Sequence, residues 1–105
     1  MVYEASLAIV VCGDLKIEKS PDYNAVNCSA ATQNILLASH NYGLGAVWLG
    51  VYPRKERMEG LSRLLKIPDH VIPISLISIG LPDEEKNAED RFNSDRVHRN
   101  GWDPG

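Results

Sequence analysis

The chain has 105 residues, of which 44% are hydrophobic and 24% are charged, and this composition fits one small domain with its own core. Its formal net charge of −3 provides no basic surface of the kind that nucleic acids require. No apolar run reaches the roughly 18 residues that span a bilayer, and no signal-peptide pattern is present. We therefore expect a cytoplasmic protein that binds neither nucleic acid nor membrane.

A first strand is predicted over residues 6–13, where a continuous run of apolar, mostly β-branched residues ends at Gly13. Such a run is typical of a strand that is buried on both faces. Cys12 in this run and the later Cys28 are far apart in the sequence and form no C-x-x-C pair. We expect both to be reduced core thiols.

A long helix is predicted over residues 22–42, with apolar residues on nearly every side. A helix of this kind is buried. Asp22 or Asn24 could cap its N-terminus, and Asn27 or Ser29 could do so if the helix begins later. Because so small a domain has little interior in which to surround such a helix, we expect it to lie at a subunit interface.

A short buried strand is predicted over residues 46–50. Gly43 and Gly45 follow a helix and lead into this strand, which is the reverse of the order in a dinucleotide-binding glycine motif, so we assign them to helix capping and a tight turn. Gly50 ends the strand. A glycine there either lets a flat ligand approach the backbone or allows a simple bend.

The next two predicted elements are an amphipathic helix over residues 54–65 and a nearly all-apolar strand over residues 71–80. Beyond them, residues 83–105 are rich in charged residues, Asn, Gly and Pro, with few apolar anchors. This composition predicts an extended tail that lies over a surface, such as that of a partner subunit. We therefore expect a single domain with a core of residues 1–82 and a tail of residues 83–105.

Residues that could carry chemistry are sparse. His40, His70 and His98 have no ligand spacing with Cys, Asp or Glu, which argues against a metal site. No residue stands out as a general base or nucleophile, so an enzymatic role requires a cofactor. The cations of the tail, Arg91 among them, are either solvated or suited to a phosphate group.

Several distinctive sequence blocks follow one another across essentially the whole chain: Ala5–Asp14, Asn27–Ala38, Gly43–Gly50 with Tyr52-Pro53, Ile74–Gly80 with Pro82, and Asp90-Arg91-Phe92 to Trp102. In this order they resemble the C-terminal part of the FMN-dependent nitroreductase family. The resemblance implies an α+β fold of nitroreductase type with a central sheet and a long buried helix. It also implies truncation at the N-terminus, since the family's N-terminal Arg-rich segment has no counterpart here.

The resemblance further implies a homodimer or higher oligomer, formed through the 22–42 helix and the C-terminal tail, with FMN at the interface. Trp48, Leu49 and Gly50 match the segment whose backbone meets the flavin ring. Arg91 matches the tail residue that reaches the FMN phosphate, and Lys86 is a second candidate for that role. The chemistry lies on the flavin, so no catalytic side chain is expected.

Two functions from different classes follow. The first is an FMN-dependent NAD(P)H oxidoreductase that reduces nitroaromatics, quinones or similar small acceptors. The alternative is a non-catalytic, truncated family remnant, or a flavin- or partner-binding module that dimerises without turnover. Retention of FMN by the purified protein discriminates between a flavoprotein and a remnant that binds no flavin.

Overall fold

The computed structural model describes residues 6–81 and 91–102. In chain order the elements are β1 (Leu7–Asp14), α1 (Pro21–Asn41), β2 (Gly45–Gly50), α2 (Lys55–Leu65), β3 (Val71–Gly80) and the short 3-10 helix η2 (Ser94–Arg96). The five larger elements each begin and end within one residue of the predicted bounds. The α+β class predicted from the sequence is confirmed.

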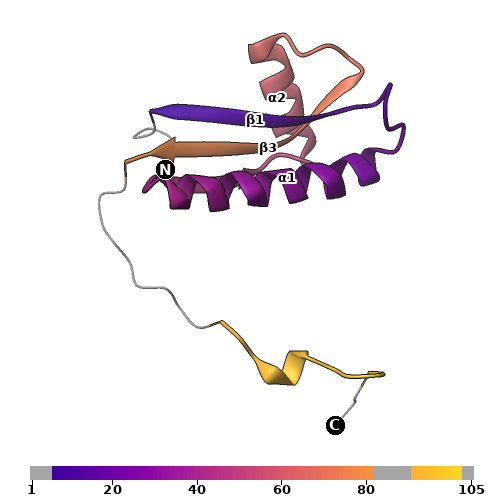
Figure 1. Ribbon diagram of the computed structural model, residues 1–105. Helices are drawn as coiled ribbons and strands as arrows, with labels where there is room; N and C mark the ends of the chain where they lie inside the picture. Colours follow the sequence, from indigo (N-terminus) through magenta and orange to yellow (C-terminus); the bar gives the residue numbers. More distant parts are fainter. Residues whose placement is uncertain (1–5, 82–90, 103–105) are drawn as a thin grey trace.

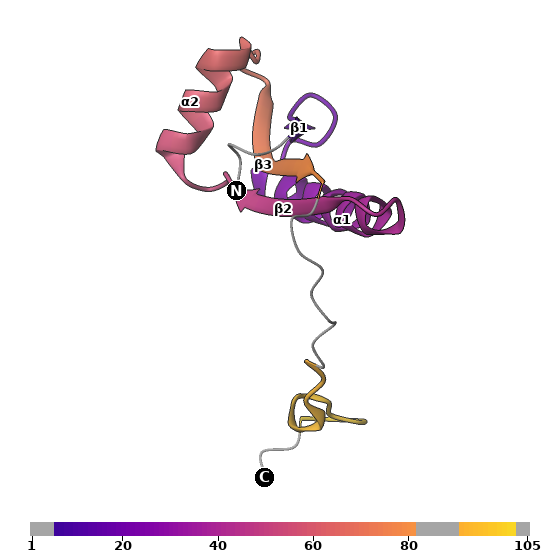
Figure 2. The same cartoon turned by 90° about the vertical axis from the view of Figure 1, so that its left-hand side faces the viewer.

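The strands form one antiparallel sheet with β3 in the centre, between β1 and β2. Because β1 and β2 lie on opposite sides of β3, the helix that connects them crosses the sheet. Helix α1 therefore contacts all three strands and covers one face, whereas α2 contacts β3 on the other face (Figures 1 and 2). One face of the sheet is therefore covered by α1 along all three strands, and the other face is covered by α2 mainly over β3.

The core lies between β3 and α1. Ile77 is fully buried at its centre, and Thr32 and Ser75 are fully buried beside it. The Thr32 hydroxyl donates to the Cys28 carbonyl at 2.6 Å and lies 2.7 Å from the Ser75 hydroxyl. Since the single Thr32 proton is used in the first bond, Ser75 donates in the second. Two polar side chains are thus satisfied inside an apolar core.

The prediction that the first two strands are fully buried is wrong. In β1 only Gly13 is buried, and in β2 Val47 and Trp48 are exposed. Both strands are edges of the sheet formed by the described residues, so each has a neighbour on one side only. Burial is most complete in the central strand β3, where six of the ten residues are buried.

Helix α1 is the predicted long helix, and one copy of the chain surrounds it only in part; its place at a subunit interface stays a prediction. One side of α1 is buried against the sheet, whereas Tyr23, Val26 and Leu37 are exposed. A straight helix presents only one face to a sheet, so the apolar residues of its other face stay in solvent in one copy of the chain.

Helix α1 is capped two residues before Asp22, the first of the proposed caps. Its N-cap is Ser20, whose side chain accepts a hydrogen bond from the Tyr23 amide at 3.3 Å. Pro21 occupies the first helical position, where its fixed φ and missing N–H are favourable. Asn24 is buried instead and donates to the carbonyls of Glu18 and Ser20 at 2.7 and 3.0 Å. Asp22, Asn27 and Ser29 lie inside the helix.

The segment of residues 91–102 lies apart from the sheet in both views (Figures 1 and 2). It contains η2 and a stacked pair of rings, His98 and Trp102, whose centroids are 4.3 Å apart. No helix among the described residues is long and apolar enough to cross a membrane. The division into a core and a tail stays a prediction.

Candidate functional site

The end of β2 at Gly50 presents open backbone. Strand β2 is an edge of the described sheet, and Gly50 pairs with Ser75 across the ladder. The next residue, Val51, donates its N–H to the Ile74 carbonyl at 3.3 Å. In an antiparallel ladder this bond flanks a pair that shares no direct hydrogen bonds, so the N–H and C=O of Gly50 point away from β3. They face the open side of the sheet.

Nothing in the described fold requires glycine at position 50. A Cβ built there meets no atom within 4 Å, and its φ lies outside the left-handed region. Gly13 is the opposite case, because a Cβ there would lie 2.6 Å from Cγ of Asn24. The space beside Gly50 is therefore free for a flat group to contact the backbone directly.

The side chains of the two residues before Gly50 point to opposite faces of the sheet. Trp48 pairs with Ile77 and shares the α1 face with it, whereas Leu49 pairs with Leu76 on the α2 face. A single flat ligand cannot meet both side chains from one face. The predicted site residues Trp48, Leu49 and Gly50 are thus contiguous, but only Trp48 and Gly50 turn their backbone N–H and C=O away from β3, because these groups alternate along the ladder.

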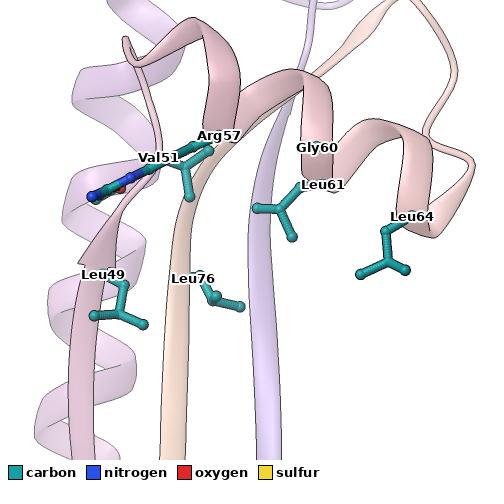
Figure 3. A pocket seen from close by; sticks show the side chains of 8 residues that line it. Leu49, Val51, Arg57, Gly60, Leu61, Leu64 and Leu76 are labelled. Carbon is teal, nitrogen blue, oxygen red and sulfur yellow. The ribbon is translucent and has the colours of Figure 1, made fainter. Parts of the chain in front are cut away.

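An apolar groove of about 410 Å³ opens between α2 and the sheet beside Gly50. Figure 3 shows Leu49 and Leu76 of the sheet beneath Leu61 and Leu64 of α2. The groove is lined by Leu49, Gly50, Val51, Arg57, Gly60, Leu61, Leu64 and Leu76. Although the sequence predicted an apolar face for α2, Leu64 is 76% exposed, because the groove is left uncovered by the described residues.

Arg57 is the charged side chain of this groove. Its Nη1 donates to the Gly50 carbonyl at 2.8 Å. From the sequence, Arg57 was expected on the polar face of the amphipathic helix, and no role was predicted for it. Its position in the first turn of a helix that closely follows Gly50 is a signal that could have identified it.

The loop after β2 is tied to the start of α1. The Tyr52 hydroxyl donates to Oδ1 of Asp22 at 2.8 Å. This bond to a carboxylate raises the pKa of Tyr52 above its ordinary value of 10.0, with burial and the negative charge of Asp22 as lesser causes. The two residues are 30 positions apart, so no local pattern predicts their contact.

Arg91, the first predicted phosphate ligand, is not brought to the Gly50 end of its own chain. Arg91 lies in the segment that stands apart from the sheet (Figure 1), and Lys86 lies outside the described residues.

The two cysteines are free, as predicted. Burial raises the pKa of both thiols, and Cys28 adds a smaller charge effect on Cys12, so neither is an activated nucleophile at neutral pH. Within residues 6–81 and 91–102 no three His, Cys, Asp or Glu side chains gather to hold a metal ion.

Comparison with known proteins identifies relatives of this arrangement. The model of the family described as "Nitroreductase family" matches residues 1–81. A "Putative NADH dehydrogenase/NAD(P)H nitroreductase" from Methanothermobacter thermautotrophicus is 52% identical over 97% of this chain and 53% of its own length. A protein of the same name from Archaeoglobus fulgidus is 54% identical over 97% of this chain and 61% of its own length. The chain thus spans a little over half the length of these relatives.

Solved structures show the same fold. A protein from Parabacteroides distasonis with the same name is 43% identical and superposes with a TM-score of 0.86, covering 94% of this chain and 58% of that one. An "FMN-dependent Nitroreductase" from Clostridium difficile R20291 is 31% identical with a TM-score of 0.84, covering 93% of this chain and 59% of that one. The described core therefore has the architecture found in these structures.

Proposed function

The chain belongs to the nitroreductase family, and we propose that it is an FMN-dependent NAD(P)H oxidoreductase that reduces small acceptors such as nitroaromatics or quinones. The observation that carries this proposal is the open backbone of Gly50, whose outward N–H and empty neighbouring space suit a flat heteroaromatic ring. A relative of similar fold is named for its FMN dependence. This chain spans little more than half of the length of its relatives. That it has the activity for which the full-length relatives are named is therefore part of the proposal.

The residues present fit a flavin ring better than they fit direct acid–base or nucleophilic chemistry. When bound, FMN supplies the exchange of hydride and electrons. The part of this chain is then to bind and orient the ring. Gly50 would donate its N–H to an acceptor atom on the ring edge, and Trp48 would offer outward backbone groups two residues earlier. Burial of the ring at this strand end would exclude water from its contact edge.

The phosphate end needs a cation, and we assign that role to Arg91, with Lys86 as a second candidate. A guanidinium binds phosphate through two parallel hydrogen bonds and is always charged. Since the segment of residues 91–102, which contains Arg91, lies apart from β2 (Figure 2), the proposal includes a second copy whose tail brings Arg91 to this site.

The proposed homodimer, or a higher oligomer, uses the outer face of α1 together with the tail. Tyr23, Val26 and Leu37 give this face an exposed apolar stripe at helical spacing. Ala30 between them is exposed and small, and would allow a second helix to approach closely. A second copy would remove these side chains from water.

The test is FMN titration of the full chain, followed by visible spectroscopy and size-exclusion chromatography. We expect retained flavin and an elution volume smaller than that of a monomer, which corresponds to a dimer. Arg91→Ala should weaken FMN binding by about 1.5–3 kcal/mol, the value of a lost charge-assisted bond. Arg99→Ala on the same segment is the matched control. Failure to retain flavin at saturating FMN would refute the proposal.

A second candidate is a flavin- or partner-binding module without turnover. It is favoured by the uncovered α2 face of the sheet together with the greater length of the relatives. Mixing the FMN-loaded protein with NADH or NADPH and a quinone separates the two functions. Oxidation of the nucleotide that depends on the acceptor supports the enzyme, whereas bound flavin that neither nucleotide reduces supports the module.

A further inference from the structure

The side chain of Arg57 connects the first turn of α2 to the last residue of β2. Its Nη1 donates to the Gly50 carbonyl at 2.8 Å across seven positions of the chain. Among residues 6–81 and 91–102 no carboxylate forms an ion pair with Arg57. The charge of the guanidinium is therefore directed at a backbone carbonyl, and a charge-assisted bond of this kind is stronger than one between neutral groups.

The Gly50 carbonyl lies in the peptide group that joins Gly50 to Val51. It points away from β3 at the edge of the sheet, while the Val51 N–H of the same peptide group is bonded to the Ile74 carbonyl at 3.3 Å. Gly50 has no side chain that packing could fix, and a glycine has more backbone freedom than any other residue. The neighbouring N-cap of α2, Arg54, forms no side-chain capping bond. The bond from Arg57 is therefore a second restraint on this peptide group, from the side that faces away from β3.

We propose that Arg57 is a positioning residue for the flavin contact: through the Gly50 carbonyl it holds the peptide group between Gly50 and Val51, and so limits ψ of Gly50, the residue whose N–H faces the proposed ring. This inference rests on the proposed function, because the orientation of the Gly50 N–H affects binding only if a flavin ring is its ligand. It also places a positive charge one peptide group from the proposed ring contact. A cation there favours the reduced flavin, which carries more negative charge.

The experiment uses the full chain and three variants: Arg57→Ala, Arg57→Lys and, as a matched control, Arg63→Ala, which removes an exposed arginine from the same helix. Fluorescence titration gives the FMN dissociation constant, and equilibration with a reference dye gives the reduction potential of the bound flavin. Arg57→Ala should weaken FMN binding about tenfold, because the Gly50 contact is less ordered before binding and a nearby positive charge is lost, and should lower the potential. Arg57→Lys should restore part of both, and Arg63→Ala should stay within about twofold of the parent protein.

A second measurement does not depend on flavin. In ¹⁵N-labelled protein without FMN, the Gly50 amide should be rigid in the parent and in Arg63→Ala, and mobile in Arg57→Ala. If the parent binds FMN but Arg57→Ala has the same affinity, potential and Gly50 amide mobility, the positioning role is refuted. If the parent binds no FMN, the proposed function fails, and the amide measurement alone then decides whether Arg57 holds Gly50.

Discussion

The two faces of the sheet differ in how completely they are used. On the α1 face, Ile77 is fully buried and Thr32 is bonded to Ser75. On the α2 face, an open groove lies between Leu76 and the helix, and Leu64 is largely in solvent. The closed face accounts for the stability of the fold, and the open face and its Gly50 edge are free to bind. Substitutions on the two faces should therefore have separable effects.

The largest effect on stability is expected from Ile77→Ala. Removal of a fully buried side chain from the centre of the core should lower the free energy of unfolding by about 2–5 kcal/mol. Leu64→Ala, on the open face, should change it by less than about 0.5 kcal/mol. Urea denaturation followed by circular dichroism measures both. Equal losses would show that the open face is covered in solution.

The two glycines with opposite surroundings give the next contrast. Gly13→Ala places a Cβ 2.6 Å from Cγ of Asn24, which is held by two hydrogen bonds, and should cost about 1–3 kcal/mol of stability. Gly50→Ala meets no protein atom and should leave the stability of the flavin-free protein nearly unchanged. It should nevertheless weaken FMN binding, because the methyl group fills the space proposed for the ring. Unchanged FMN affinity in Gly50→Ala would remove that position from the site.

The buried hydroxyl pair allows a smaller and more specific test. Thr32→Val keeps the shape of the side chain but leaves the Ser75 hydroxyl without its acceptor, and should cost about 1–2 kcal/mol. The double variant Thr32→Val/Ser75→Ala should lose less stability than the sum of the losses in the two single variants, since both partners of the bond are then absent. Thermal denaturation of the four proteins gives this comparison. Strict additivity would mean that the bond contributes nothing.

The smallest effect is expected at the loop that joins the Gly50 end to α1. The pKa of Tyr52 is raised in the folded protein by its bond to Asp22, so the folded state holds this proton more tightly than the unfolded state. The stabilisation is complete below the ordinary pKa of 10.0 and is lost as the pH rises through the higher folded value. Tyr52→Phe should therefore lie below the parent in stability near neutral pH and converge with it in strong alkali. Parallel curves at all pH values would show that the bond does not form in solution.

Local patterns in the sequence were enough to predict the elements and their bounds, because periodicity and turn residues act over a few neighbouring positions. The α+β class followed from the resemblance to a known family. The nearly all-apolar run at residues 71–80 coincides with the central strand β3 (Val71–Gly80). Ser20 was missed as the N-cap because several capping residues follow it closely, and only the Pro21 position discriminates among them.

Only the tertiary structure decided which apolar residues are buried and which backbone is open. The order β1-β3-β2 makes two of the three strands edges, and no pattern within a strand encodes its neighbours. The same order turns the backbone groups of Gly50 outward and brings Arg57 to its carbonyl. Contacts between distant residues, such as Thr32 with Ser75 and Tyr52 with Asp22, depend on how the elements pack, and packing is a property of the whole chain.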